Sequence, residues 1–159
     1  DDDVADVTVS VSPTKIRFEA GDIALTSKVI DGSFPDYTRV IPYQNDRRME
    51  TDAADFAKAV DRVATVSAER SRAVKLALEE DRLTLTVNSP DAGSATEEVT
   101  VAYGDAPLEI GFNAKYLLEI AGQIDRENAV FLFADSGAPT LVREGDDDSA
   151  IYVVMPMRV

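Results

Sequence analysis

The sequence predicts an α+β fold in which antiparallel strands carry two helices on one face. The first observation is the alternation of apolar and polar residues in short segments such as 7–11, 74–78 and 83–87, which is typical of half-buried strands. The second is helical spacing of apolar residues in two segments, 51–63 and 113–124. A helix followed by three strands occurs twice, which predicts two half-modules related by an internal pseudo-twofold repeat.

The first 42 residues are predicted to be strands and tight turns. Three short alternating stretches are separated by Ser12-Pro13 and Gly21-Asp22, which are turn signals. Three strands without a partner helix do not make a complete domain, so residues 1–42 are predicted to be the closing strands of an incomplete one. The following segment, YQNDRRME at 43–50, is polar and without period, and it is predicted to be a linker.

Residues 51–159 are predicted to form one domain. Thr51 or Asp52 caps the first helix and Asn113 caps the second. The polar stretch 91–98 is predicted to be a hairpin loop, and the acidic stretch 144–148 a solvated turn rather than a Ca²⁺ site. The expected apolar helix faces are Phe56, Ala59, Val60 and Val63 in the first helix, and Leu117, Ile120, Ala121 and Ile124 in the second.

Composition excludes several kinds of chemistry. Cysteine and histidine are both absent, so a Ser-His-Asp triad, a cysteine nucleophile and a Cys/His zinc site cannot be built. No P-loop or GxGxxG motif is present, and the acidic residues are too scattered to favour a carboxylate–metal enzyme. A paired Asp/Glu or Mg²⁺ site stays formally possible, but it needs acids that converge on one pocket, so no metal and no cofactor are predicted.

The net charge of −14 comes from 16 basic and 30 acidic residues. An acidic chain is repelled by nucleic acid phosphates, so charge alone argues against direct DNA binding. There is no apolar run near the roughly 18 residues that a membrane span needs.

Two segments carry the functional prediction: the chain end, AIYVVMPMRV at 150–159, and DGSFPDYTRVIP at 31–42. The chain end continues apolar past Pro156, which cannot donate to a strand ladder, and an exposed apolar stretch usually marks a binding site. Composition alone favours a core role for about half of it. Together the two segments resemble the bacterial DNA polymerase III sliding clamp, the beta subunit, over essentially the whole chain.

This resemblance implies a DNA-clamp fold, with residues 1–42 in the second clamp domain and 51–159 as the third. It also implies a hydrophobic cleft that binds partner peptides of the Gln-Leu-x-Leu-Phe type. Methionine suits such a cleft because its flexible side chain adapts to different partners. The implied cleft residues are Pro35, Tyr37, Arg39, Val40, Val153, Val154, Met155, Pro156, Met157 and Arg158, with Asn113, Tyr116, Pro139 and Thr140 at its edge.

The resemblance further implies a processivity factor of bacterial DNA replication, in the cytoplasm, which is a non-catalytic subunit of the DNA polymerase III holoenzyme. When full length, a homodimeric ring encircles duplex DNA and slides, so topology holds it in spite of its charge. Its cleft tethers the DNA polymerase III alpha subunit, the clamp loader, other polymerases and repair proteins. A strand and a helix of the third domain face the neighbouring subunit, and the candidates are the strand ending at Val101 and Tyr103 and residues near Asn113.

Helix cations are the candidates for facing DNA: Lys58, Arg62 and Lys115, with Arg70, Arg72 and Arg126 nearby. An ordinary mixed-charge helix surface is an equally good interpretation of each of them. Two alternative functions remain open from the residues: a stand-alone peptide-binding module, and an acidic adaptor that does not encircle DNA.

Overall fold

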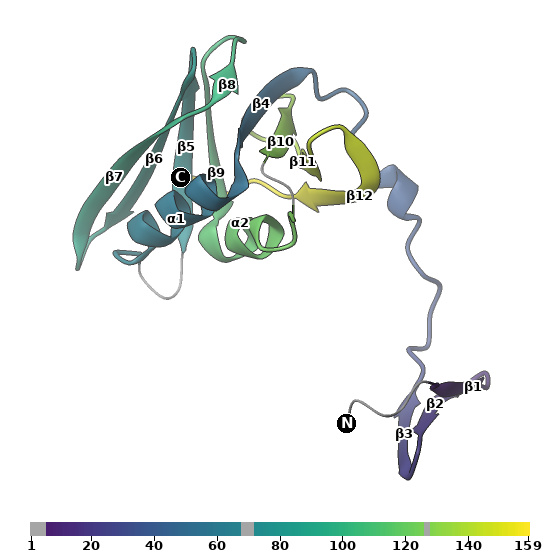
Figure 1. The fold of residues 1–159 in the computed structure, drawn as a ribbon. Helices are drawn as coiled ribbons and strands as arrows, with labels where there is room; N and C mark the ends of the chain where they lie inside the picture. The colour runs from purple at the N-terminus through teal and green to yellow at the C-terminus, as the bar shows by residue number, and fades with distance from the viewer. Residues whose placement is uncertain (1–5, 68–71, 126–127) are drawn as a thin grey trace. The chain divides into compact units, whose positions relative to one another are not determined.

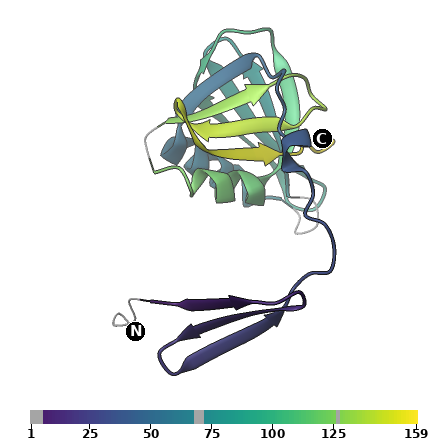
Figure 2. The same cartoon turned by 90° about the vertical axis from the view of Figure 1, so that its right-hand side faces the viewer.

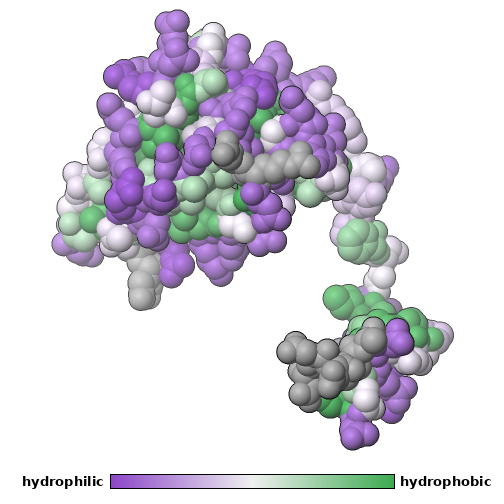
Figure 3. Space-filling view, viewed as in Figure 1, coloured by the Kyte–Doolittle hydropathy of each residue, from purple (hydrophilic) through white to green (hydrophobic). Residues whose placement is uncertain are grey.

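The computed structural model describes residues 6–67, 72–125 and 128–159. The chain divides into two compact units, Asp1–Asp36 and Tyr37–Val159. The first unit is a three-stranded antiparallel sheet in the order β1-β2-β3, formed by β1 (Thr8–Val11), β2 (Lys15–Ala20) and β3 (Ile23–Lys28). This confirms the three strands predicted for this part of the chain. Several of its apolar side chains are exposed, namely Val7, Val9, Val11, Ile23 and Leu25. Figure 3 shows hydrophobic residues, in green, on the surface of this unit.

The second unit holds two sheets and two helices. A short 3-10 helix, η1 (Tyr37–Arg39), begins it. The first half then contains β4 (Arg47–Asp52), α1 (Ala53–Ala64), β5 (Ala73–Glu79), β6 (Arg82–Ser89) and β7 (Gly93–Thr100). The second half contains β8 (Ala102–Tyr103), β9 (Leu108–Asn113), α2 (Ala114–Ala121), β10 (Asn128–Phe133), β11 (Thr140–Glu144) and β12 (Asp147–Val154).

The strand before each helix is continuous with one half of the unit but pairs with the strands of the other half. β4 leads into α1 but lies in the five-stranded sheet, in the order β12-β11-β10-β4-β8. β9 leads into α2 but lies in the four-stranded sheet, in the order β7-β6-β5-β9. All strand pairings among the described residues are antiparallel, and the two helices lie side by side on the same side of the sheets (Figures 1 and 2). The predicted order of a helix followed by three strands, occurring twice, is therefore confirmed.

Both helices begin at the predicted caps. The Asp52 side chain accepts a hydrogen bond from the Asp55 amide at 2.8 Å, and the Asn113 side chain accepts one from the Lys115 amide at 2.9 Å. These bonds satisfy amides that have no partner within the helix. Among the described residues, neither helix is long and apolar enough to cross a membrane.

The core lies between the helices and the sheets. Period-two alternation in β5 and β6 buries Val74, Leu76 and Leu78 on one strand and three apolar partners on the next. Helical spacing brings Phe56 of α1 into the same cluster. Its ring lies 5.0 Å from that of Phe131 on β10, centroid to centroid, so α1 is fastened to the sheet of the other half.

The structure corrects two predictions about local structure. Residues 47–50, predicted to be part of a linker, belong to β4, where Met49 and Thr51 are buried. The stretch 91–98, predicted to be a loop, is largely β7. Among the described strands β7 lies at the edge of its sheet, paired with β6. Its partly buried face carries Ala95 and Val99, but polar Glu97 lies between them and interrupts the apolar alternation.

Replacing Phe131 with alanine is expected to destabilise the second unit by about 3–5 kcal/mol, because the change leaves a cavity between α1 and β10. Phe131 is 1% exposed, whereas Phe34 is 85% exposed. Phe34→Ala is therefore the matched control and should change the free energy of unfolding by no more than about 0.5 kcal/mol. Denaturant unfolding followed by circular dichroism measures both values; equal effects would contradict the assigned core.

Candidate functional site

A cavity of about 590 Å³ opens between α2 and β12. One wall is the exposed side of α2 and the turn after it, and the other is the last part of β12 and the residue that follows. The first wall contains Tyr116, Glu119, Ile120 and Gln123, and the second Ile151, Tyr152, Val153, Val154 and Met155. Four predicted cleft residues, Tyr116, Val153, Val154 and Met155, therefore line one cavity.

Exposure separates the roles of these four residues. Met155 is 59% exposed and Tyr116 is 53% exposed, so both present apolar surface to solvent. Val154 is buried and belongs to the core cluster. The interpretation of this stretch as core is thus correct for Val154, whereas Met155 and Tyr116 have the exposure that a ligand-binding surface requires.

The chain end continues into a second hollow of about 640 Å³. Pro156, Met157 and Arg158 line it, together with Gly111 of β9 and Gly137 of the loop before β11. The Met157 amide donates a hydrogen bond to the Gly111 carbonyl at 2.7 Å. The predicted cleft residues of the chain end are thus divided between two neighbouring cavities.

Three predicted cleft-edge residues support the walls and line neither cavity. Asn113 caps α2, which carries Tyr116. The Pro139 carbonyl accepts a hydrogen bond of 2.8 Å from the Asn45 side chain. Thr140 is fully buried opposite Val154, and its Oγ1 has no hydrogen-bond partner among the described residues.

The segment 35–40 is exposed throughout. Tyr37 and Arg39 lie on η1, and the Val40 amide donates to the Tyr37 carbonyl at 3.0 Å. None of Pro35, Tyr37, Arg39 and Val40 is among the residues that line the cavity between α2 and β12.

Sequence reasoning missed five residues of the cavity: Glu119, Ile120, Gln123, Ile151 and Tyr152. Ile120 was assigned to the buried face of the helix, and it is in fact half-buried. Its position four residues after Tyr116 was the available signal, because residues i and i+4 share one face of a helix.

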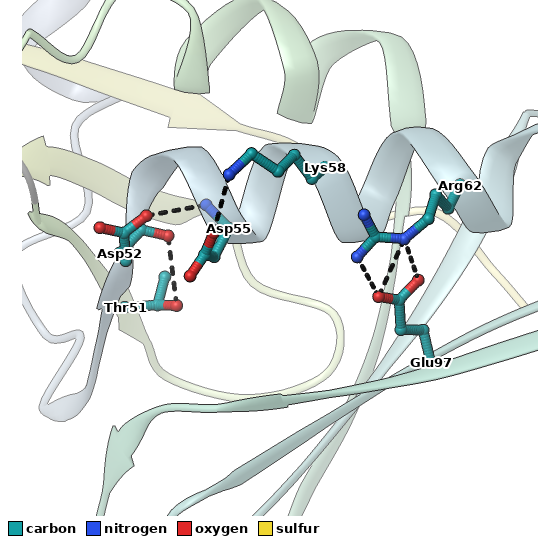
Figure 4. Close-up of polar contacts among 6 residues, drawn as sticks. All are labelled: Thr51, Asp52, Asp55, Lys58, Arg62 and Glu97. Carbon is teal, nitrogen blue, oxygen red and sulfur yellow. Dashed lines mark hydrogen bonds and ion pairs between the residues drawn. The ribbon is translucent and has the colours of Figure 1, made fainter.

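The three cations predicted to face DNA all have acidic partners (Figure 4 shows two of them). Arg62 of α1 forms a forked contact with Glu97 of β7, with Nε 3.0 Å and 2.9 Å from the two carboxylate oxygens. Lys58 Nζ lies 3.0 Å from Asp55, and Lys115 Nζ lies 3.6 Å from Glu119. Each cation is therefore partly neutralised by a neighbour. Arg72 is exposed, and Arg70 and Arg126 lie outside the described residues.

The contact between Arg62 and Glu97 shifts the pKa of both groups. The hydrogen bond from Arg62 lowers the pKa of the Glu97 carboxyl, and the same bond raises the pKa of Arg62. Both groups remain charged near neutral pH. Within the described part of the chain, no group of three or more acidic residues could hold a metal ion.

This geometry defines the class of protein: an α+β clamp-type domain with an apolar cavity beside its chain end. Residues 38–158 match the family model described as the DNA polymerase III beta subunit, C-terminal domain. The chain therefore belongs to the family of DNA polymerase III beta subunits, the bacterial sliding clamps.

Individual relatives agree with this assignment. The chain is 59% identical to the beta sliding clamp of Caulobacter vibrioides over 96% of its length, and 38% identical to that of Escherichia coli over 95%. In both comparisons it covers 41% of the relative, so it spans about two fifths of the curated relatives it matches. The sliding clamp of Bartonella birtlesii, solved bound to griselimycin, superposes with a TM-score of 0.92 at 49% identity, covering 99% of this chain and 43% of that one.

Glu97→Gln is expected to lower the thermal stability of the domain near pH 7 and to have no effect in acid. The folded state lowers the pKa of Glu97, so the contact stabilises the fold above the usual carboxyl pKa of 4.5 and is lost as the pH falls through the lower folded value. Thermal unfolding of both proteins at pH 7 and pH 3 measures this. Glu98→Gln is the matched control, because Glu98 makes only a 4.0 Å contact with Arg82; an equal loss in both variants would argue against the pairing.

Proposed function

We propose that this chain is part of a sliding clamp that acts as a processivity factor in bacterial DNA replication. As part of a homodimeric ring in the cytoplasm, it encircles duplex DNA and slides along it. It tethers the DNA polymerase III alpha subunit, and it also binds the clamp loader, other polymerases and repair proteins. It is a non-catalytic subunit, because its part is to hold partners on DNA.

The observation that carries this proposal is the cavity between α2 and β12. It is lined on both sides by apolar side chains, and two of them, Met155 and Tyr116, are more than half exposed. A hydrophobic peptide side chain entering it removes apolar area from water, which contributes roughly 25 cal/mol per Å². The flexible thioether of Met155 accommodates leucine or phenylalanine alike.

The segment 35–40 supplies a second part of the proposed cleft. Tyr37 and Val40 are exposed apolar residues, and Arg39 adds a charged group beside them. We propose that these residues contact the bound peptide, and that Pro35 stiffens the backbone as the segment enters the site. Pro156, Met157 and Arg158 extend the cleft over the second hollow.

In this proposal the ring stays on DNA by encircling it, and its direct contacts with DNA are weak. The outward side of α1 carries Lys58 and Arg62, but also the acidic Asp55 and Asp61, and the nearest acids are paired with the cations. Such a surface attracts phosphate only slightly, and this favours sliding over fixed binding. A ring does not need strong contacts to stay on DNA.

We propose that ring closure uses the free edge of β7. Among the described strands β7 pairs with β6 alone, and a strand of a neighbouring subunit can extend its other edge. The strand predicted as a subunit contact, ending at Val101 and Tyr103, overlaps β7 only at its start, and those two residues are buried. Residues near Asn113 are a weaker candidate, because Asn113 is occupied in capping α2.

Met155→Ala and Arg39→Ala are each expected to weaken binding of a labelled Gln-Leu-x-Leu-Phe peptide about tenfold, as expected for central contacts of a binding site. Fluorescence anisotropy of the peptide titrated with this chain measures the dissociation constant. Leu25→Ala and Arg17→Ala are the matched controls, because both lie on the exposed three-stranded sheet. Griselimycin should compete with the peptide for this chain.

Full affinity in both Met155→Ala and Arg39→Ala would contradict the cleft. A third outcome is that peptide binding depends on the cleft but the full-length protein does not remain on nicked circular DNA. That outcome would favour a stand-alone peptide-binding module.

Charge reversal of the helix cations is expected to reduce loading of the full-length ring on nicked circular DNA, with a larger effect at low salt, because screening removes it. Arg62→Glu and Lys115→Glu are the test variants. Arg62→Glu also disrupts the contact with Glu97, so the exchange Arg62→Glu with Glu97→Arg is the control that restores a pair. If loading is unchanged both in Lys115→Glu and in the protein with the Arg62–Glu97 exchange, these residues do not face DNA.

A further inference from the structure

The chain end joins the edges of the two sheets. β12 is the edge of the five-stranded sheet, and β9 is the edge of the four-stranded sheet. After β12 the chain crosses to β9, where Met157 and Gly111 form an isolated antiparallel bridge. Its hydrogen bond, from the Met157 amide to the Gly111 carbonyl, is 2.7 Å long. In Figure 1 the C-terminus accordingly lies beside β9.

Gly111 is required here for space rather than for backbone conformation. Its φ is not in the left-handed region. A Cβ at this position would lie 2.7 Å from the Met157 carbonyl oxygen and 2.8 Å from Val159 Cγ2, and it would meet Val159 Cγ1 more closely still. Ordinary carbon contacts are about 3.5–4.0 Å. Because Met157 contributes a backbone atom, the tail has to move if a Cβ is added.

The bridge lies at the base of both walls of the cavity. Two residues after Gly111, Asn113 caps α2, which carries Tyr116 and Ile120 on one wall. Two residues before Met157, Met155 ends the other wall. The rest of that wall, Ile151 to Val154, pairs with β11, so Met155 is the wall residue whose position depends on where the tail meets β9.

We infer that Gly111 is a positioning residue that fixes the place of Met155 in the peptide-binding cavity by allowing the tail to dock on β9. This inference rests on the proposed function, because the cavity is the one that receives the peptide. Gly111 acts through the tail, which holds Met155 opposite Tyr116. A side chain at position 111 lifts the tail and displaces Met155 from that wall.

The position of the tail can be measured without any peptide. The chain contains no cysteine, so spin labels at Gln123→Cys and Arg158→Cys report only the distance between α2 and the tail. Both positions are exposed. Pulsed electron–electron resonance should give a broader distance distribution for Gly111→Ala than for the parent.

Gly104→Ala is the matched control, because no atom lies within 4 Å of the added Cβ and its φ is ordinary. It should reproduce the parent distribution. Val87→Ala, a core change in β6, is the control for stability: it lowers the melting temperature without touching the tail. A distribution for Gly111→Ala that matches the parent, or that Val87→Ala reproduces, would overturn the inference.

If Gly111→Ala does not fold, Met157→Pro decides the question, because it removes the donor of the bridge without adding a group at position 111. It should broaden the distribution, and an unchanged distribution would overturn the inference.

Peptide binding provides the second measurement. Gly111→Ala is expected to weaken binding about tenfold, and Gly104→Ala and Val87→Ala should stay within about twofold of the parent. Failure of the parent chain to bind peptide would count against the proposed function, whereas the distance distributions would still decide the role of Gly111.

Discussion

The exchange of β4 and β9 between the two sheets is the constraint on which the second unit depends. Each strand is continuous with a helix of its own half and paired with the strands of the other half. Neither half-module can therefore complete its sheet alone. The exchange also brings α1 and α2 together on one side, where Phe56 of α1 meets Phe131 of β10. The pseudo-twofold repeat is thus a consequence of pairing, not only of sequence order.

The same exchange places the candidate site. Because β9 lies at the edge of one sheet and β12 at the edge of the other, α2 and the chain end face each other across a cavity. The site uses parts of the fold that are already fixed by ladder hydrogen bonds and by a capped helix. Only the exposed side chains, chiefly Met155 and Tyr116, are left to adapt to a ligand. A stiff frame with flexible contact groups is the physical basis for binding several partners at one site.

Periodicity predicted most of this fold, because strands such as β5 and β6 bury every second residue and the helices have one apolar face. It failed at β4, where Met49 is the only large apolar residue, and at β7, where an edge position needs little burial. In both, backbone pairing determines the structure, and pairing partners distant in sequence leave no local pattern.

The site was predicted less completely than the fold, for a related reason. The resemblance identified Met155 and Tyr116, but a sequence motif does not show how deeply each side chain is buried. Thr140 was predicted at the rim and is fully buried. No pattern in the sequence indicates that position 111 must be glycine, because the need for glycine arises only from the chain end that lies against it in the folded protein.

In the proposed function, charge and topology together explain how an acidic chain can serve on DNA. Pairing of Arg62 with Glu97 and of Lys58 with Asp55 leaves α1 with little net attraction for phosphate. A protein held on DNA by such contacts alone would dissociate readily at physiological salt, where charges are screened beyond about 8 Å. The proposed closed ring removes that requirement, because dissociation then needs a subunit contact to open. In this proposal the stability that matters is that of the ring's interfaces, and the mixed charge of the helices is compatible with rapid movement along the duplex.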